Sequence, residues 1–158
     1  MSTVLRAMTE AAYARFKDNS VADYAKENVA AGRWPDAAAL ERSRLAYEQL
    51  LPQGLATPGQ HLFTIHDVAQ GLDVGVLWLA VVDHPGGRSG HVYDLLVFPA
   101  YRRLGHARAA FAALEALARA WGLSELGLHV FAHNQAAQAL YRSLGFRVTG
   151  LNMQKRVS

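Results

Sequence analysis

One short stretch in the second half of the chain combines the features of an anion-binding turn. Residues 95–106 read LLVFPAYRRLGH, so an apolar run meets Pro99, which cannot donate to a sheet ladder and must end a strand. Arg102, Arg103 and Gly105 follow, and a helical pattern begins directly after them. The first turn of a helix leaves backbone N–H groups unpaired at the positive end of the helix dipole. We therefore predict that a phosphorylated ligand binds at this turn.

The spacing within the turn narrows the choice of ligand. The turn lacks the Gly-Lys-Ser/Thr ending of a P-loop, and the chain lacks the three-glycine fingerprint of a dinucleotide site. The turn matches Arg/Gln-x-x-Gly-x-Gly/Ala through Arg102, Gly105 and Ala107, and a second block, NQAAQALYRSLGF, occupies residues 134–146. The two blocks resemble the GNAT N-acetyltransferase family, in which the first block is the acyl-CoA signature. The likeness is close in the C-terminal half and extends to the N-terminal half in layout only.

The resemblance implies that acetyl-CoA is the co-substrate and assigns its contacts. The pyrophosphate is expected at the backbone amides of the turn, with charge from the arginines, at Arg102, Arg103, Leu104, Gly105, His106, Ala107 and Arg108. The pantetheine arm is expected along the main chain of the preceding strand, beside a gap to the next parallel strand, at Leu95, Leu96 and Val97. Asn134 is implied as a further contact. It is also a good helix N-cap, and the two roles can coexist.

Tyr141 stands where the family carries its general acid, between Ala139-Leu140 and the Arg142-to-Phe146 segment. A phenol with an ordinary pKa of about 10 is protonated at neutral pH and can give a proton to a leaving thiolate. The alternative is a tyrosine that contributes only packing.

The general base is open among three residues. The resemblance points to His129, at a strand position where some family members carry a glutamate, and imidazole titrates near neutrality. A structural role for this histidine is the slightly better interpretation. Asp94 and its neighbour Tyr93 compete with it, because an acid inside an apolar strand needs either a partner or a function.

Composition excludes several other kinds of site. The chain has no cysteine, which rules out a disulfide framework, a cysteine-ligated zinc site and an acyl-cysteine intermediate. His129 and His133 would lie about 13 Å apart on a strand at ~3.3 Å per residue, so no metal site is expected. No Gly-x-Ser-x-Gly signature is present. Direct attack by the acceptor amine is therefore the mechanism that fits.

Charge and hydropathy bear on partners and location. The net charge is +3, but the basic residues form no long run, so nucleic acid is not an expected partner. No stretch reaches the length of a transmembrane helix, and the amino terminus lacks a signal pattern. We expect a cytoplasmic protein that does not enter a membrane.

The elements that must position these residues follow from periodicity and turn signals. Residues 1–158 are enough for one domain with its own core. Helices are expected at residues 9–31, with a break at 18–20, and at 36–51, 105–121 and 134–144. Strands are expected at residues 4–8, 61–66, 72–82, from 91 to the Pro99 stop, at 126–131, and as a last strand or hairpin at 147–156.

This order predicts an α/β (mixed α+β) fold with a central sheet of six or seven strands. The sheet begins as an antiparallel meander and continues through a βαβ crossover. In the second helix, Leu40 and Tyr47 are among the positions expected to be buried.

Two functions remain open at the level of sequence. The first is an acetyl-CoA-dependent N-acetyltransferase acting on a primary amine in a ternary complex. The second is a non-catalytic acyl-CoA-binding sensor or interaction module with the same fold. Tyr141 favours the enzyme, because a binder has no need of a proton donor. The acceptor is left as a small-molecule amine, an amino acid or a peptide amino terminus, and a homodimer is compatible with the family.

Overall fold

A five-stranded mixed sheet forms the centre of the computed structural model, which describes residues 2–158. The strands lie side by side in chain order, with the first four antiparallel and the last parallel to its neighbour. They are β1 (Thr3–Ala7), β2 (Gln60–Asp67), β3 (Leu72–His84), β4 (Gly87–Val97) and β5 (Leu123–Leu128).

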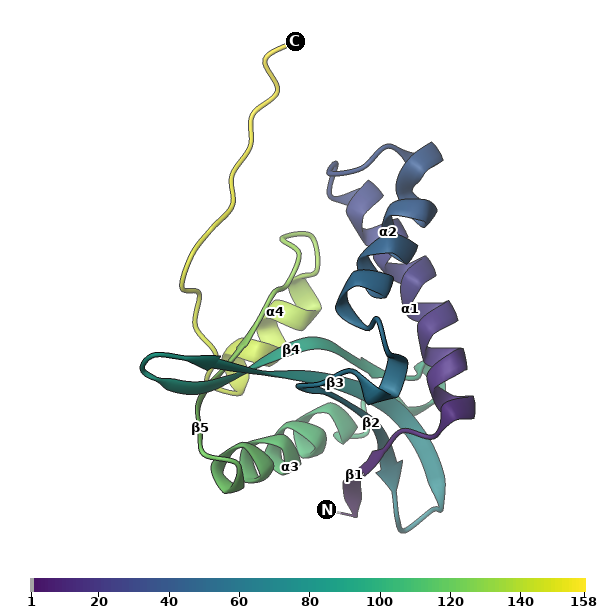
Figure 1. Ribbon diagram of the computed structural model, residues 1–158, viewed down its shortest axis with the longest axis vertical. Helices are drawn as coiled ribbons and strands as arrows, with labels where there is room; N and C mark the ends of the chain where they lie inside the picture. Colours follow the sequence, from purple (N-terminus) through teal and green to yellow (C-terminus); the bar gives the residue numbers. More distant parts are fainter. Residues whose placement is uncertain (1) are drawn as a thin grey trace.

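Helices cover both faces of this sheet (Figure 1). The long helices α1 (Glu10–Ala30) and α2 (Asp36–Leu50) lie on one face, and α3 (His106–Ala120) lies on the other. α4 (Gln135–Ser143) follows β5, and two short 3₁₀ turns, η1 (Gly54–Ala56) and η2 (Pro99–Tyr101), complete the chain of elements. No helix within residues 2–158 combines the length and apolar composition needed to cross a bilayer.

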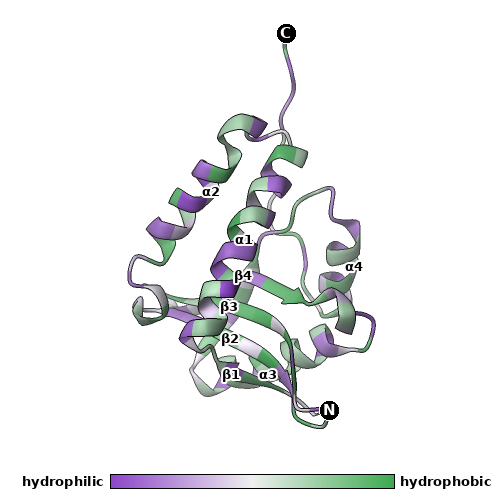
Figure 2. Cartoon of the chain, turned by 90° about the vertical axis from the view of Figure 1, so that its right-hand side faces the viewer, coloured by the Kyte–Doolittle hydropathy of each residue, from purple (hydrophilic) through white to green (hydrophobic). Residues whose placement is uncertain are grey.

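Each face of the sheet has its own apolar core. Under α1 and α2 the core is built around Trp78, which is 1% exposed, with Phe16 and Tyr47 packed against it. Under α3 it is built around Phe111 and Leu77, both fully buried. Figure 2 shows the hydrophobic character of the strands between these layers. The predicted α/β class, the meander and the βαβ crossover are confirmed.

The predicted number of strands, six or seven, is wrong, because residues 147–158 form no strand. A strand exists only where its backbone groups meet a neighbour's, and this segment runs away from the sheet as an exposed tail (Figure 1).

The predicted break in the first helix is also wrong: α1 is continuous through residues 18–20. Serine disfavours the interior of an isolated helix, because its hydroxyl competes for the backbone hydrogen bonds of the helix. Here that hydroxyl donates to Asp94 on β4, at 3.2 Å. In α2 the buried side chains are Ala39, Ser43 and Tyr47, so Tyr47 is buried as predicted. Leu40, one position round the helix from that stripe, is 60% exposed, contrary to prediction.

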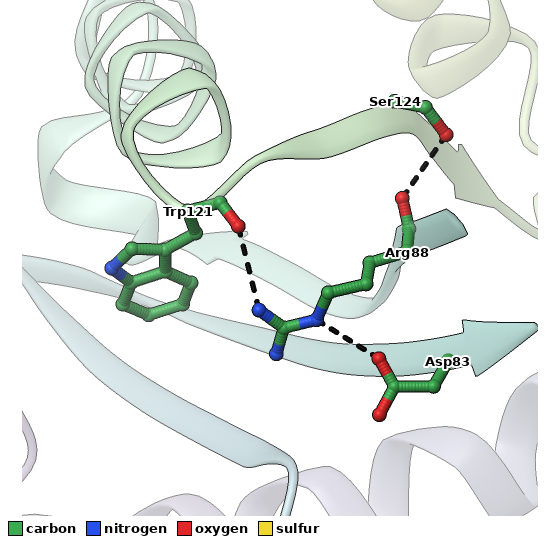
Figure 3. Close-up of polar contacts among 4 residues, drawn as sticks. All are labelled: Asp83, Arg88, Trp121 and Ser124. Carbon is green, nitrogen blue, oxygen red and sulfur yellow. Dashed lines mark hydrogen bonds and ion pairs between the residues drawn. The ribbon is translucent and has the colours of Figure 1, made fainter.

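β5, which was predicted at residues 126–131, lies earlier in the chain, at Leu123–Leu128. Its pairing with β4 begins soon after α3 ends. Leu123 is opposite Arg88, whose carbonyl accepts a hydrogen bond from the Ser124 hydroxyl at 3.0 Å. The Arg88 guanidinium donates to Asp83 at 2.9 Å and to the Trp121 carbonyl at 3.4 Å (Figure 3). These bonds hold the start of β5 against β4.

Gly75 allows β3 and β4 to approach where β4 ends. A Cβ atom at this position would lie 2.2 Å from the Leu96 carbonyl oxygen and 3.1 Å from the Val97 Cα. We expect Gly75→Ala to lower the free energy of unfolding by about 1–3 kcal/mol, as overpacking does. Gly127→Ala is the matched control, because a Cβ there meets nothing within 4 Å. Denaturant unfolding of both variants checks this, and equal losses would contradict it.

Candidate functional site

β4 and β5 separate near the middle of β4. Their pairing ends at Val92 opposite Leu128, whereas β4 continues to Val97 with β3 as its partner. The register with β3 also shifts here, since Trp78 pairs with Asp94 and Leu79 with Val92, which leaves Tyr93 as an extra residue. Such a bulge bends a strand and increases its twist. The result is an opening between the two strands.

The open edge of β4 presents backbone groups to this opening. The N–H of Phe98 donates to the Val74 carbonyl at 2.8 Å. Because antiparallel pairs alternate between bonded and non-bonded positions, this bond directs the N–H and C=O groups of Leu95 and Val97 away from β3. An extended ligand with amide groups could pair with them as an added strand does.

The turn after β4 has a conformation suited to an anion. Arg103 has a φ of 63° and Gly105 a φ of 85°, both in the left-handed region. Within residues 2–158, the backbone N–H groups of residues 103–108 have no hydrogen-bond acceptor, and no side chain caps α3. A pocket of about 260 Å³ adjoins them, lined by Val97, Tyr101, Arg102, Arg103, Gly105, His106, Ala107, Arg108 and Leu140.

Three side chains of the turn already have partners. The Arg102 Nε donates to the Val97 carbonyl at 2.9 Å, which ties the turn to the end of β4. Arg108 donates to the Ser143 hydroxyl at 2.9 Å, which ties α3 to α4. His106 is buried, and its Nδ1 lies 3.2 Å from the Thr3 hydroxyl of β1. Its ring is therefore structural, and only its backbone N–H faces the turn.

Tyr141 enters the site from α4. Its ring packs edge-on against Phe111 and Phe146, with centroids 5.8 and 5.9 Å away. Burial raises the pKa of the Tyr141 phenol, and the charges of Asp94 and Glu27 raise it further. The hydroxyl therefore stays protonated across the neutral range.

Asp94 lies on β4 where the opening begins, with its side chain toward α1. It is partly buried and accepts a hydrogen bond from Ser20 at 3.2 Å. Burial raises its pKa to about 6, the Ser20 hydroxyl lowers it, and Glu27 and Asp23 raise it. A carboxyl with this pKa is largely ionised at neutral pH and can accept a proton.

Sequence reasoning missed Ser20 as part of this site. It is 5% exposed on the core-facing side of α1, and 74 residues separate it from Asp94. The available signal was a serine at a core position of a helix, which here has a buried partner on β4.

His129 was predicted within a strand at residues 126–131, but it lies one residue beyond the end of β5 and is exposed. Its ring meets Phe131 edge-on at 5.0 Å. Partial burial lowers its pKa, and the charge of Arg33 lowers it further. Asn134 caps α4 as predicted, accepting the Ala137 N–H at 3.1 Å.

A second pocket of about 260 Å³ lies on the α1 side of the sheet. Its lining includes Ser20 and Leu96 from the site, together with Arg15, Asn19, Asp73 and Gly75. Within residues 2–158, no three His, Asp or Glu side chains are arranged to hold a metal ion.

Comparison with known proteins identifies the fold and the class. Residues 21–146 match the Acetyltransferase (GNAT) family. Two proteins of Bacillus subtilis (strain 168), both named uncharacterized N-acetyltransferases, match almost end to end. YdgE is 34% identical over 157 residues, 99% of each chain, and YycN is 37% identical over 158 residues, 99% of this chain and 100% of YycN.

Solved structures support the same family assignment. The YycN crystal structure superposes with a TM-score of 0.93 at 36% identity, covering 99% of both chains. A Pyrococcus furiosus structure described as an acetyl transferase shares the fold, with a TM-score of 0.69 at 19% identity. The chain therefore belongs to the GNAT acetyltransferase family, as the motifs predicted.

Proposed function

We propose that this protein is an N-acetyltransferase that transfers the acetyl group of acetyl-CoA directly to a primary amine. The observation that carries the proposal is the opening between β4 and β5, with the uncapped start of α3 at one end and Tyr141 beside it. A phosphate site, an extended backbone edge and a proton donor adjoin one another there. These are the three things that a pantetheine thioester requires of its site.

The residues present fit the co-substrate. The free N–H groups of residues 103–108 suit a pyrophosphate, because a helix start and a left-handed glycine favour an approaching anion. The outward N–H and C=O groups of Leu95 and the outward N–H of Val97 suit the amides of a pantetheine arm, while the Val97 carbonyl already accepts from Arg102. Asn134 remains a candidate contact at the start of α4.

The proposed reaction forms one bond, breaks one bond and moves two protons. The acceptor nitrogen forms a bond to the thioester carbonyl carbon, and the carbon–sulfur bond breaks. Asp94 takes the proton that the nitrogen loses, directly or through water, and Tyr141 gives a proton to the departing sulfur. We prefer Asp94 to His129 as the base because Asp94 lies at the opening, whereas His129 is exposed beyond the end of β5.

The acceptor is proposed to approach from the α1 side, where the pocket lined by Ser20 and Leu96 lies. The test of the whole proposal is release of free CoA thiol from acetyl-CoA with a panel of primary amines. Turnover with at least one amine supports an enzyme. Tight acetyl-CoA binding with no turnover on any amine would instead support the acyl-CoA-binding sensor.

Gly105→Val should weaken acetyl-CoA binding. The left-handed φ of 85° disfavours a β-branched residue, and the added side chain obstructs approach to the amides. We expect KM for acetyl-CoA to rise at least about tenfold, the equivalent of ~1.4 kcal/mol. Gly122→Val is the control, since Gly122 has a φ of 71° in open space after α3. If both variants raise KM equally, the turn is not the binding site.

A further inference from the structure

The sheet is incomplete at its β5 edge. β5 is the last strand in the order, and within residues 2–158 nothing pairs with its outer side. Neither β5 nor α4 contains a fully buried residue, whereas β3 contains seven in succession. The apolar side chains Leu123, Leu126 and Leu128 are only partly covered by α3 and its neighbours. An open strand edge with a half-covered face is a template for another strand.

The C-terminal tail has the pattern of a strand but no partner. Leu151, Met153 and Val157 share one face of an extended chain with Lys155, and the three apolar side chains are 79%, 91% and 92% exposed. Asn152, Gln154 and Arg156 occupy the opposite face. The alternation of apolar and polar side chains over residues 151–154 is typical of a strand with one buried side.

The path of the tail takes it away from its own β5. After Gly145 (φ 96°) the chain passes α4 and runs beyond the ends of α1 and α2 (Figure 1). Gln154 lies beside the turn after α1, its Nε2 3.7 Å from where a Cβ on Gly32 would be. One molecule therefore has both a free edge and a free strand-like segment, which do not meet.

We propose that residues 147–158 add as a sixth strand to the β5 edge of a second copy of this chain, and that the second copy returns its tail in the same way. Two such exchanges are related by a two-fold axis and close the assembly as a dimer. Each exchange would cover Leu151, Met153 and the partly exposed leucines of β5 together. The charges of the two segments are complementary, because the tail carries Arg147, Lys155 and Arg156, and the exposed acid on β5 is Glu125.

Light scattering coupled to size exclusion tests this proposal on the full chain. Wild type is expected at twice the mass of one chain across the micromolar range. The double variant Leu151→Asp, Met153→Asp places charges on the apolar face and is expected at half that mass. The control Asn152→Asp, Gln154→Asp adds the same charge on the opposite face and is expected to remain a dimer. A monomeric wild type, or equal behaviour of the two double variants, overturns the proposal.

Hydrogen exchange on the wild type gives an independent measurement that needs no variant to fold. The amides of β5 and of residues 150–157 are expected to be protected, and at least about tenfold less so when dilution produces monomer. Protection that persists unchanged in the monomer would mean that the tail folds onto its own β5. The proposed swap of tails between two chains would then be wrong. The proposal does not depend on the acetyl-transfer chemistry, so both measurements stand whatever the activity assays give.

Discussion

Tyr141→Phe is expected to lower kcat by about 10²–10⁴-fold, the usual loss when a general acid is removed. The substitution deletes one oxygen and keeps the ring that packs against Phe111 and Phe146. Stability should therefore change little. KM for acetyl-CoA should hardly move, because the proposed contacts to the co-substrate are backbone groups of the turn and of β4.

Steady-state kinetics on both proteins with the same amine checks this prediction. A loss confined to kcat indicates an interaction made in the transition state, whereas a rise in KM alone would indicate a binding contact. Phe111→Leu is a useful comparison, because it disturbs the packing of the Tyr141 ring and leaves its hydroxyl. If Tyr141→Phe stays within about twofold of wild type while chemistry is rate-limiting, Tyr141 is a packing residue.

Asp94→Asn is the second substitution with a large expected effect, a loss of about 10²-fold or more in kcat/KM. The wild-type rate should rise with pH through about 6, because Asp94 accepts a proton only when ionised and burial raises its pKa to about 6. The variant should lack this limb of the profile. A pH–rate curve for each protein from acidic to neutral pH is the measurement.

The same substitution should make the protein more stable at neutral pH. The pKa of Asp94 is about 6 in the folded chain against an ordinary value of 3.8, so between these values the folded state holds the proton more tightly. The contribution of Asp94 to the stability of the folded state is therefore largest below about pH 4, and it is lost as the pH rises to about 6. Asparagine avoids that penalty, on the order of 1–3 kcal/mol at pH 7. Thermal unfolding at pH 4 and pH 7 should show an advantage for the variant only at pH 7.

A loss of activity together with a gain of stability distinguishes a catalytic carboxylate from a structural one. His129→Ala is the matched control and should leave both kcat and the pH profile near those of wild type. If His129→Ala loses the rise of the rate with pH and Asp94→Asn keeps it, His129 and not Asp94 is the general base.

The sequence by itself determined the glycine-containing turn before α3, the capped start of α4 and the family. These features are local, since Pro99 ends a strand, Gly105 permits a left-handed φ and Asn134 caps α4, each within a few residues of its effect. The α/β class was also within reach, because strand and helix periods alternate along the chain in the order of a meander and a crossover.

Tertiary structure alone decided which polar residues meet and where the sheet ends. Ser20 and Asp94 are 74 residues apart, and only packing of α1 onto β4 unites them, which also keeps α1 continuous where local propensity favours a break. The bulge at Tyr93 and the anchoring of β5 by Arg88 set the point where the strands part, and so place His129 beyond β5. A strand forms only beside a partner strand that is distant in the sequence. The pattern of residues 147–158 could therefore predict a strand, but it could not predict whether that strand would pair with the sheet of the same chain.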